Sequence, residues 1–290
     1  MIMEYIIFDL EWNNAFNYRT QKGINEIIEI GAVKLNEDFE VVDTFKQLIY
    51  PRLSKKLGSN FKKLTHITME EIRAEGISFD EAFADFSRWS RGNNVVFLSW
   101  SNSDLYTLAD NYKRFKNTPD VEFMHYYADA QSYCMQFIND HNGTQISLSK
   151  CAEKFGVDAD TAKFHRALED CFVTAYCLKK VFDKDKFEKF IIKCDTCFFE
   201  RLVFKSYFIN KPVCGDFNVN EVELKCPVCS GAVSPLGKYE FNNNTFRNSG
   251  VCNQCGKKFW LFVRAKQTYD EIVITQRLVA INKKRARFIN

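Results

Sequence analysis

Hydrophobic and polar positions in the first two thirds of the chain follow the patterns of strands and helices in turn. Short apolar runs predict five buried strands, at residues 5–10, 26–35, 40–50, 95–100 and 124–127. Amphipathic spacing predicts helices at residues 79–89, 104–115, 147–155 and 166–182. Capping boxes, in which a hydroxyl residue precedes a Glu by three positions, place helix starts at Thr68 and Ser78. This order of elements predicts an α/β fold in which helices flank a mixed five-stranded sheet.

The pattern changes in the last third of the chain. Apolar residues at helical spacing over residues 186–208 predict one long helix, with Cys194 and Phe198 on its apolar face. Beyond about residue 216, short strands, turn residues and paired cysteines follow. We therefore expect a first domain at residues 1–183, a helical connector at 184–215, and a small second domain with a basic tail at 216–290.

Composition favours a folded protein without a membrane span. The 290 residues are 46% hydrophobic and 15% aromatic, which is typical of a chain that buries a core. No apolar run reaches the ~18 residues of a membrane helix, and the first residues lack the basic start of a secretory signal. A cytoplasmic location is therefore expected, in which the 11 cysteines are thiols or metal ligands rather than disulfides.

Charge divides the chain into two unlike parts. Residues 1–183 hold 21 Lys and Arg against 27 Asp and Glu, whereas residues 184–290 hold 19 against 10. The net charge of +3 therefore combines an acidic first part with a basic second part. A basic module favours a polyanionic partner, most often nucleic acid.

Four acids and a histidine stand at positions where α/β proteins place their sites. Asp9 and Glu11 are two residues apart on the first strand, so their side chains project from the same face. Paired carboxylates are ligands of hard metals such as Mg²⁺ and Mn²⁺. Asp104 begins the helix that follows the fourth strand. His165 precedes the helix that carries Asp170, and from a loop it can fold back over the same face.

In this order, the five residues resemble the DEDDh class of 3′–5′ exonucleases in the ribonuclease H-like superfamily. Neighbouring motifs extend the resemblance over about residues 4–182: FDLE at 8–11, IIEIGAV at 27–33, SWSNSD at 99–104 and HRA at 165–167. The last two are similar to the Eri-1/3′hExo-like branch, which acts on RNA. His66 lies in the stretch LTHIT, at a position where the family has a Gly.

The resemblance implies the chemistry of the site. Asp9 would bridge two catalytic Mg²⁺ or Mn²⁺ ions, with Glu11 and Asp170 completing the ligands of one of them. Asp104 would support the other ion. His165 would be the general base that takes the proton of the attacking water, because a His titrates near neutral pH. The products would be nucleoside 5′-monophosphates. Substrate contacts are expected from Leu10, Trp12, Asn13 and His66.

Paired cysteines predict a structural zinc site in the second domain. Two C-x-x-C pairs separated by 22 residues supply the four thiolates of a zinc ribbon: Cys226, Cys229, Cys252 and Cys255. A domain this small needs a stabilising cross-link, such as a bound metal ion, to fold. A third pair, Cys194 and Cys197, lies in a helical pattern and is interpreted as core. A second zinc site that includes Cys214 is left open.

Basic and aromatic residues alternate beside the second cysteine pair, which suits both nucleic-acid binding and packing of the ribbon: Lys257, Lys258, Phe259, Trp260, Arg264 and Lys266. The sequence thus predicts a two-metal exonuclease that acts on the 3′ end of a single strand, RNA in preference to DNA. The zinc ribbon would bind substrate or a protein partner. A DNA exonuclease, an endonuclease and a non-catalytic adaptor on the same scaffold are the alternatives.

Overall fold

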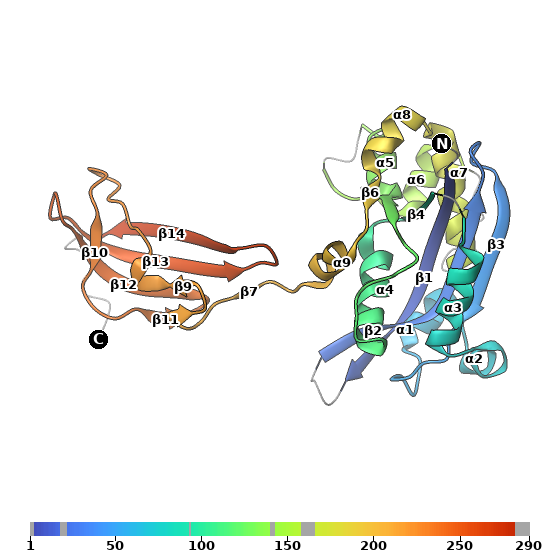
Figure 1. The fold of residues 1–290 in the computed structure, drawn as a ribbon, viewed down its shortest axis with the longest axis horizontal. Coiled ribbons are helices and arrows are strands. Elements are labelled where there is room, and N and C mark those ends of the chain that lie inside the picture. The colour runs from blue at the N-terminus through green and yellow to red at the C-terminus, as the bar shows by residue number, and fades with distance from the viewer. Residues whose placement is uncertain (1–2, 18–21, 93, 140–142, 158–165, 282–290) are drawn as a thin grey trace. The chain divides into compact units, whose positions relative to one another are not determined.

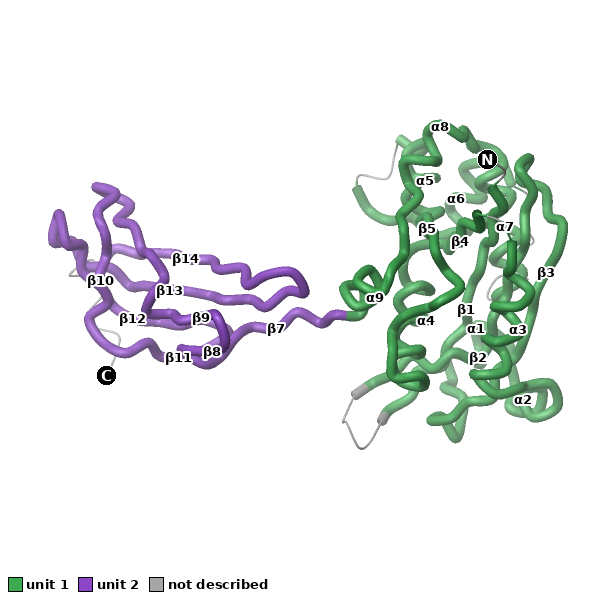
Figure 2. The backbone as a smooth tube through the Cα atoms, viewed as in Figure 1, with its two compact units in different colours: residues 1–203 green, residues 204–290 purple. Residues whose placement is uncertain are grey.

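The structure is a computed structural model that describes residues 3–17, 22–92, 94–139, 143–157 and 166–281. The chain forms two compact units, residues 1–203 (unit 1) and residues 204–290 (unit 2), which Figure 2 colours separately. Each unit has its own sheet and its own hydrophobic core. None of the helices within the described residues is long and apolar enough to cross a membrane.

Unit 1 is built on a mixed six-stranded sheet in the order β3-β2-β1-β4-β5-β6 (Figure 1). Its strands are β1 (Glu4–Asn17), β2 (Lys22–Leu35), β3 (Val41–Leu48), β4 (Val95–Ser99), β5 (Tyr126–Asp129) and β6 (Ile192–Lys193). β1, β2 and β3 are antiparallel, whereas β4 and β5 continue parallel to β1. The predicted mixed sheet is confirmed, and the short β6, antiparallel to β5, adds a sixth strand to the five expected.

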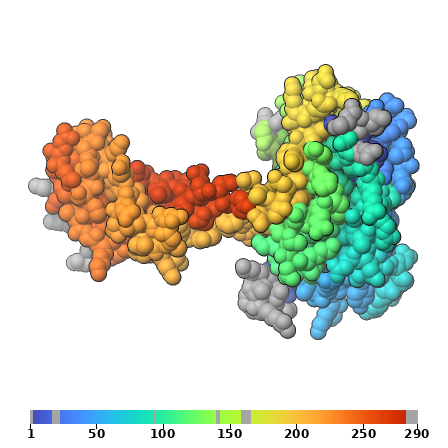
Figure 3. Space-filling view, in the orientation of Figure 1, coloured from blue at the N-terminus to red at the C-terminus, as the bar shows by residue number. Residues whose placement is uncertain are grey.

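Helices cover both faces of this sheet. They are α1 (Ser59–Thr65), α2 (Met69–Glu75), α3 (Phe79–Trp89), α4 (Asn102–Phe115), α5 (Ala130–Met135), α6 (Leu148–Lys154), α7 (Ala167–Val181), α8 (Lys184–Phe187) and α9 (Thr196–Val203). Both predicted capping boxes form, at the starts of α2 and α3. The helices α3, α4 and α9 pack on one face, and α5, α6, α7 and α8 on the other. In Figure 3, α3 and α4 (cyan and green) form much of the visible surface of unit 1.

Side chains of β1 alternate between the two faces, and this decides where its acids point. Ile6 and Phe8 are buried with residues of α3 and α4. Ile7 is buried on the opposite face, with residues of α7. Asp9 and Glu11 follow Ile7 at every second position of the strand, so both carboxylates lie on the same face as Ile7, which α7 covers.

The single helix predicted over residues 186–208 is wrong. That segment contains the end of α8, a 3₁₀ turn (Glu188–Phe190), β6, α9 and β7 (Tyr207–Phe208). The β-branched Ile192 pairs with Tyr127 on the open edge of β5, which favours a strand over a helix. Asp195 then accepts the backbone N–H of Phe198 at 2.8 Å and begins a new helix. Because α8 and α9 both contribute to the cores of unit 1, the segment up to residue 203 is part of that unit.

Unit 2 consists mainly of β-strands. The main sheet has the order β10-β12-β13-β14, with β11 paired to β12 and β7 paired to β13. Its further strands are β10 (Val233–Pro235), β11 (Glu240–Asn242), β12 (Thr245–Cys252), β13 (Lys258–Gln267) and β14 (Ile272–Ala280). A hairpin of β8 (Val213–Cys214) and β9 (Phe217–Asn218) precedes a 3₁₀ turn (Val219–Glu221). The core of the unit surrounds Phe246, Phe259 and Leu261.

Candidate active site and cysteine cluster

Three of the predicted acids meet on the face of β1 that α7 covers. One carboxylate oxygen from each of Asp9, Glu11 and Asp170 lies within 4.8 Å of the other two. Asp9 and Glu11 come from β1, and Asp170 comes from the first turn of α7. Oxygen ligands grouped in this way suit a hard divalent cation such as Mg²⁺ or Mn²⁺.

A glycine allows α7 to approach the sheet at this point. Gly31 on β2 lies opposite Asp9 in the register of β1 and β2. A Cβ atom at Gly31 would overlap the backbone of Ala167 and Leu168, at the start of α7. The missing side chain therefore sets how closely α7 packs on β2, and with it the position of Asp170.

Asp104 lies beside these three acids, in the first turn of α4. Its side chain is buried, and its Oδ1 accepts the backbone N–H of Leu10 at 3.1 Å. Leu10 stands between Asp9 and Glu11, so this hydrogen bond ties α4 to the segment of β1 that carries both acids. The structure places Asp104 next to the three-acid cluster rather than within it.

Burial and mutual repulsion raise the pKa values of these carboxyls. Burial raises the pKa of Glu11 to about 8, and the charges of Asp170 and Glu29 add to the shift. Burial raises the pKa of Asp104 to about 7. The pKa of Asp9 is raised well above its usual value by burial and then by the charge of Asp104. A divalent cation relieves such repulsion by taking the place of protons, so this donor set fits a metal ion.

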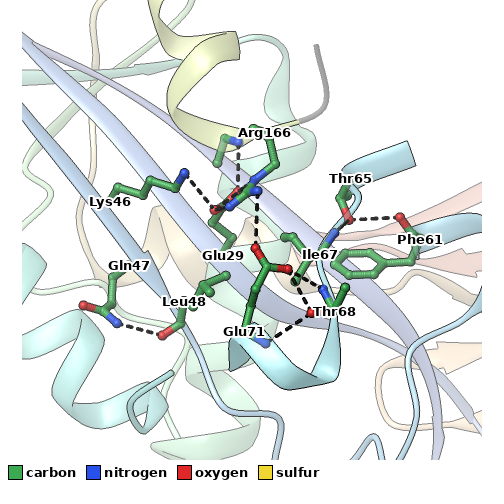
Figure 4. A network of polar contacts seen from close by, with 11 residues as sticks. Glu29, Lys46, Gln47, Leu48, Phe61, Thr65, Ile67, Thr68, Glu71 and Arg166 are labelled. Atoms are coloured by element: carbon green, nitrogen blue, oxygen red, sulfur yellow. Dashed lines mark hydrogen bonds and ion pairs between the residues drawn. The ribbon is translucent and has the colours of Figure 1, made fainter. Parts of the chain in front are cut away.

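Glu29 is a further buried acid, which lies opposite Glu11 in the register of β1 and β2. Its carboxylate accepts three hydrogen bonds from the Arg166 guanidinium, at 2.7 to 3.2 Å (Figure 4). It also accepts the backbone N–H of Ala167 at 3.2 Å, and the Lys46 ammonium lies 3.7 Å away. Neither Glu29 nor Arg166 is predicted from the sequence to have a role in the site. Glu29 lies in the motif IIEIGAV and Arg166 in the motif HRA. These two motifs are the signal in the sequence that could have linked the two residues.

His165, the predicted general base, lies outside the described residues. The next residue, Arg166, occupies the N-cap position of α7 and is held by Glu29. This ion pair therefore fixes the chain one residue after His165 and four residues before Asp170. Arg166 and Glu29 are candidate positioning residues for both.

The predicted substrate contacts on β1 have different environments. The side chain of Leu10 is 2% exposed and lies in the core. The side chain of Asn13 is 1% exposed; its amide donates to Ser54 Oγ at 2.9 Å and accepts the Gly58 N–H at 2.8 Å. The Leu10 side chain packs in the core and the Asn13 side chain holds Ser54 and Gly58, and contact of either residue with substrate stays a prediction. Trp12 is half-buried against the same core, and its contact with substrate stays a prediction.

His66 ends α1 in a left-handed conformation, with φ 58° and ψ 8°. Its backbone N–H donates to the carbonyl of Lys62 at 3.0 Å, and its side chain is exposed. Gly adopts a positive φ without strain, whereas His adopts it at some cost. The Gly that the family carries here is thus explained by the backbone. A substrate contact by the His66 side chain stays a prediction.

The four predicted zinc ligands of unit 2 converge, with one sulfur from each of Cys226, Cys229, Cys252 and Cys255 within 4.8 Å of the others. Each C-x-x-C pair forms the same turn. The backbone N–H of the first cysteine of each pair donates to the carbonyl of the residue five positions later. Cys226 donates to Gly231, and Cys252 donates to Lys257. A backbone N–H in each turn points at a sulfur: Val228 to Cys226 at 3.4 Å, and Cys255 to Cys252 at 3.5 Å. Two matching turns with four sulfurs fit a zinc ribbon.

The remaining cysteine pair is not part of such a site. Cys194 is buried in the core of unit 1, as predicted, whereas Cys197 is exposed and not part of the core. Cys214 is exposed as well. In the part of the chain that the structure describes, no group of three or more metal-ligating side chains includes any of these three residues.

A mixed sheet with acids on β1, α4 and α7 defines a ribonuclease H-like fold of the nuclease class. Residues 6–178 match the exonuclease family (RNase_T); this is more than half of the chain, and the chain belongs to that family. The predicted enzyme class, a 3′–5′ exonuclease, is therefore confirmed.

Individual relatives agree with this assignment. The chain is 32% identical over 182 residues to the probable 3′-5′ exonuclease KapD of Bacillus subtilis (strain 168), covering 62% of this chain and 85% of KapD. The nuclease domain of 3′hExo, solved with bound rAMP, superimposes with a TM-score of 0.53 at 20% identity, covering 67% of this chain and 96% of that domain. Exonuclease I of E. coli, solved with single-stranded DNA, gives a TM-score of 0.52 at 15% identity, covering 86% of this chain and 54% of that one. At these identities, the two solved structures show the shared fold.

Proposed function

We propose that this protein removes nucleotides from the 3′ end of a single strand, with RNA as the preferred substrate. The observation that carries the proposal is the convergence of Asp9, Glu11 and Asp170 within 4.8 Å. Asp104, hydrogen-bonded to the same strand, is the fourth acid of the site. Membership of the exonuclease family supplies the reaction class.

The acids would hold two divalent ions, Mg²⁺ or Mn²⁺, with Asp9 shared between them. When bound, such ions supply a nucleophilic hydroxide and stabilise the charge that develops on the phosphate. The chain itself supplies a fixed frame for the four acids. β1 presents Asp9 and Glu11, Gly31 lets α7 bring Asp170, and Asp104 is tied to β1 by the hydrogen bond to Leu10.

In the proposed reaction, His165 is the general base that accepts a proton, as the resemblance to the DEDDh class implies. A neutral imidazole can accept the proton of the attacking water near pH 7. The Arg166–Glu29 ion pair supports this role by fixing the residue next to His165. The products would be nucleoside 5′-monophosphates.

The preference for RNA is supported by the likeness of residues 99–104 to the 3′hExo-like branch and by the rAMP bound in the 3′hExo structure. DNA is the second candidate substrate, and the likeness to exonuclease I bound to single-stranded DNA favours it. A contact to the ribose 2′-OH is what distinguishes the two substrates.

The proposal is tested with 5′-labelled single-stranded RNA and DNA of one sequence, incubated with Mg²⁺ or Mn²⁺. Asp9→Asn removes the shared carboxylate, and Asp85→Asn is the matched control because Asp85 is exposed on α3 and pairs with Arg88. A ladder that descends from the 3′ end of RNA, lost only in Asp9→Asn, supports the proposal. A ladder on DNA alone reassigns the substrate. No cleavage of either strand by the folded protein contradicts the exonuclease proposal, and cuts in a circular strand indicate an endonuclease.

In this proposal, unit 2 holds one structural Zn²⁺ through Cys226, Cys229, Cys252 and Cys255. Four thiolates leave no open position for a reactive water, so the ion stabilises the fold without taking part in catalysis. Thiolates of this kind persist in a reducing compartment, which suits the cytoplasm.

A further inference from the structure

One face of the unit 2 sheet gathers aromatic and basic side chains. The strand β13 alternates strictly: its odd-numbered residues from Phe259 to Ala265 are buried, and its even-numbered residues from Lys258 to Lys266 lie on the opposite face, exposed or half-buried. We call this second side the outer face. Its central residues are Arg247 on β12, Trp260, Phe262 and Arg264 on β13, and Thr275 and Arg277 on β14.

The two aromatic rings of the outer face are accessible to a ligand. Trp260 is 40% exposed, and Phe262 is half-buried. Because they are two residues apart on one strand, their Cα atoms are separated by about 6.8 Å. Neighbouring bases in a stacked helix are about 3.4 Å apart along each strand. Adjacent bases can therefore reach both rings only when the nucleic acid is unstacked, which requires a single strand.

Three arginines surround Phe262. Arg247 and Arg277 are its neighbours in register on β12 and β14. The guanidinium of Arg277 lies over the Phe262 ring, 4.9 Å from its centroid. Arg264 is oriented by a 2.8 Å hydrogen bond from its Nε to Thr245 Oγ1. These side chains line a depression of about 300 Å³.

The charges of the three arginines are available to a ligand. Within residues 204–281, no ion pair joins Arg247, Arg264 or Arg277 to a carboxylate. Glu240 on β11 lies opposite Arg247 in register, but no ion pair connects them. Lys258 and Lys266 add two further cations on the same side of β13. The face therefore combines flat apolar rings with positive charge.

We propose that the outer face is a second nucleic-acid site, which binds a single strand independently of the acids of unit 1. One base would stack on Trp260 and a neighbouring base on the Phe262 ring or on the Arg277 guanidinium that lies over it, and phosphates would pair with Arg264 and its neighbouring arginines. Stacking of bases on aromatic side chains of a sheet is a general mode of single-strand recognition. An acidic polypeptide would satisfy the cations but would leave the exposed Trp260 ring without a partner. RNA and DNA both offer this chemistry, so the experiment includes both.

The experiment measures binding by fluorescence anisotropy, with the full chain carrying Asp9→Asn, labelled 20-nucleotide RNA or DNA, and no added Mg²⁺. Trp260→Ala should weaken binding at least fivefold, because one stacked base contributes about that much. Arg264→Gln with Arg277→Gln should weaken binding and reduce the slope of log K against log salt by roughly 0.7 for each cation. The matched control, Lys211→Gln with Lys238→Gln, removes two exposed charges of unit 2 outside the outer face and should change affinity less than twofold.

A second measurement separates binding from folding. The other tryptophans, Trp12, Trp89 and Trp100, all belong to unit 1. Single-stranded nucleic acid should therefore quench a component of the fluorescence that Trp260→Phe removes. Each variant should keep the zinc content of the parent protein, which shows that the ribbon is folded.

Several results would overturn the proposal. They are unchanged affinity in both outer-face variants, equal losses in the lysine control, and duplex binding as tight as single-strand binding. Competition by poly-glutamate as strong as competition by RNA would reassign the face to acidic polypeptides. Because no cleavage is measured, absence of exonuclease activity leaves this proposal standing. Loss of binding at the outer face likewise leaves hydrolysis of short substrates standing.

Discussion

Arg166 closes a planar fork on Glu29, with its Nη2 2.7 Å from Oε1, and Glu29 in turn lies opposite Glu11 across β1 and β2. One ion pair thus connects the start of α7 to the strand next to the metal-binding acids. Since the carboxylate of Glu29 is fully buried, the guanidinium also offsets part of the repulsion that its charge exerts on Glu11.

Arg166→Lys should lower kcat about 10- to 100-fold, the usual cost of altering a group that orients a metal ligand. Lysine keeps the charge but lacks the planar fork, so the start of α7 would lose its fixed orientation. We expect KM for a short RNA to change little and the midpoint of thermal unfolding to fall by only a few degrees. Steady-state kinetics and calorimetry measure both. Arg88→Lys, at an exposed ion pair on α3, is the control; equal effects of the two variants would show that Arg166 has no positioning role.

Gly31→Ala should reduce activity at least tenfold and destabilise the protein by about 1–3 kcal/mol. The added methyl group overlaps the backbone of Ala167 and Leu168, so α7 must move away from β2 and take Asp170 with it. Gly23→Ala is the matched substitution on the same strand, because among the described residues no atom beyond its chain neighbours lies within 4 Å of the added Cβ. Nuclease assays and denaturant unfolding of both variants test the idea. Full activity in Gly31→Ala would mean that α7 does not need this close approach.

The stability of the protein without Mg²⁺ or Mn²⁺ should fall as the pH rises from about 5 to 8. The pKa of Glu11 is raised to about 8 and that of Asp104 to about 7, so the folded state binds protons that the unfolded state has released. Stability then decreases with pH throughout that window. Added Mg²⁺ should raise the unfolding temperature more at pH 8 than at pH 6, because it competes with fewer protons. Thermal unfolding at several pH values measures this. A Mg²⁺ effect that does not grow with pH would argue against a metal at these acids.

The sequence predicted the parts of the site that depend on local spacing. Asp9 and Glu11 follow from the period of a strand, and the four clustered cysteines of unit 2 follow from two short motifs. By contrast, Glu29 and Arg166 are 137 residues apart, and only the fold shows that one neutralises the other. Hydrophobic periodicity carries no information on such a pairing.

Two errors have one physical cause, which is that tertiary contacts outweigh local pattern. The predicted first strand ended at residue 10, whereas β1 continues to Asn17 because its hairpin with β2 pairs the polar residues. The apolar spacing of residues 186–208 predicted a helix, but Ile192 instead pairs with the open edge of β5 and forms a strand of the sheet.

His66→Gly should stabilise the protein by about 0.5–1 kcal/mol, because Gly releases the strain of a positive φ at the end of α1 and loses only part of the gain to chain entropy. Lys63→Gly, three residues earlier in the same helix, should instead destabilise by about 1 kcal/mol. Denaturant unfolding of variants that also carry Trp260→Phe, followed by tryptophan fluorescence, reports on unit 1, which contains Trp12, Trp89 and Trp100. Lower stability of His66→Gly would show that the imidazole makes a contact that outweighs the strain.

Cys226→Ser should abolish zinc binding and unfold unit 2, since apparent binding energies of structural zinc reach roughly 10 kcal/mol and form part of the folding energy. Cys226 and Cys252 also belong to the core of that unit, so the loss of the ion and the loss of packing act together. Cys214→Ser, at an exposed cysteine outside the cluster, should keep one zinc per chain. Metal analysis and limited proteolysis of the full chain distinguish the two variants. Unit 1, which has its own cores, should stay resistant to protease and keep its activity on short substrates in both. A Cys226→Ser protein whose unit 2 resists protease as the parent does would show that the four sulfurs are not a structural metal site.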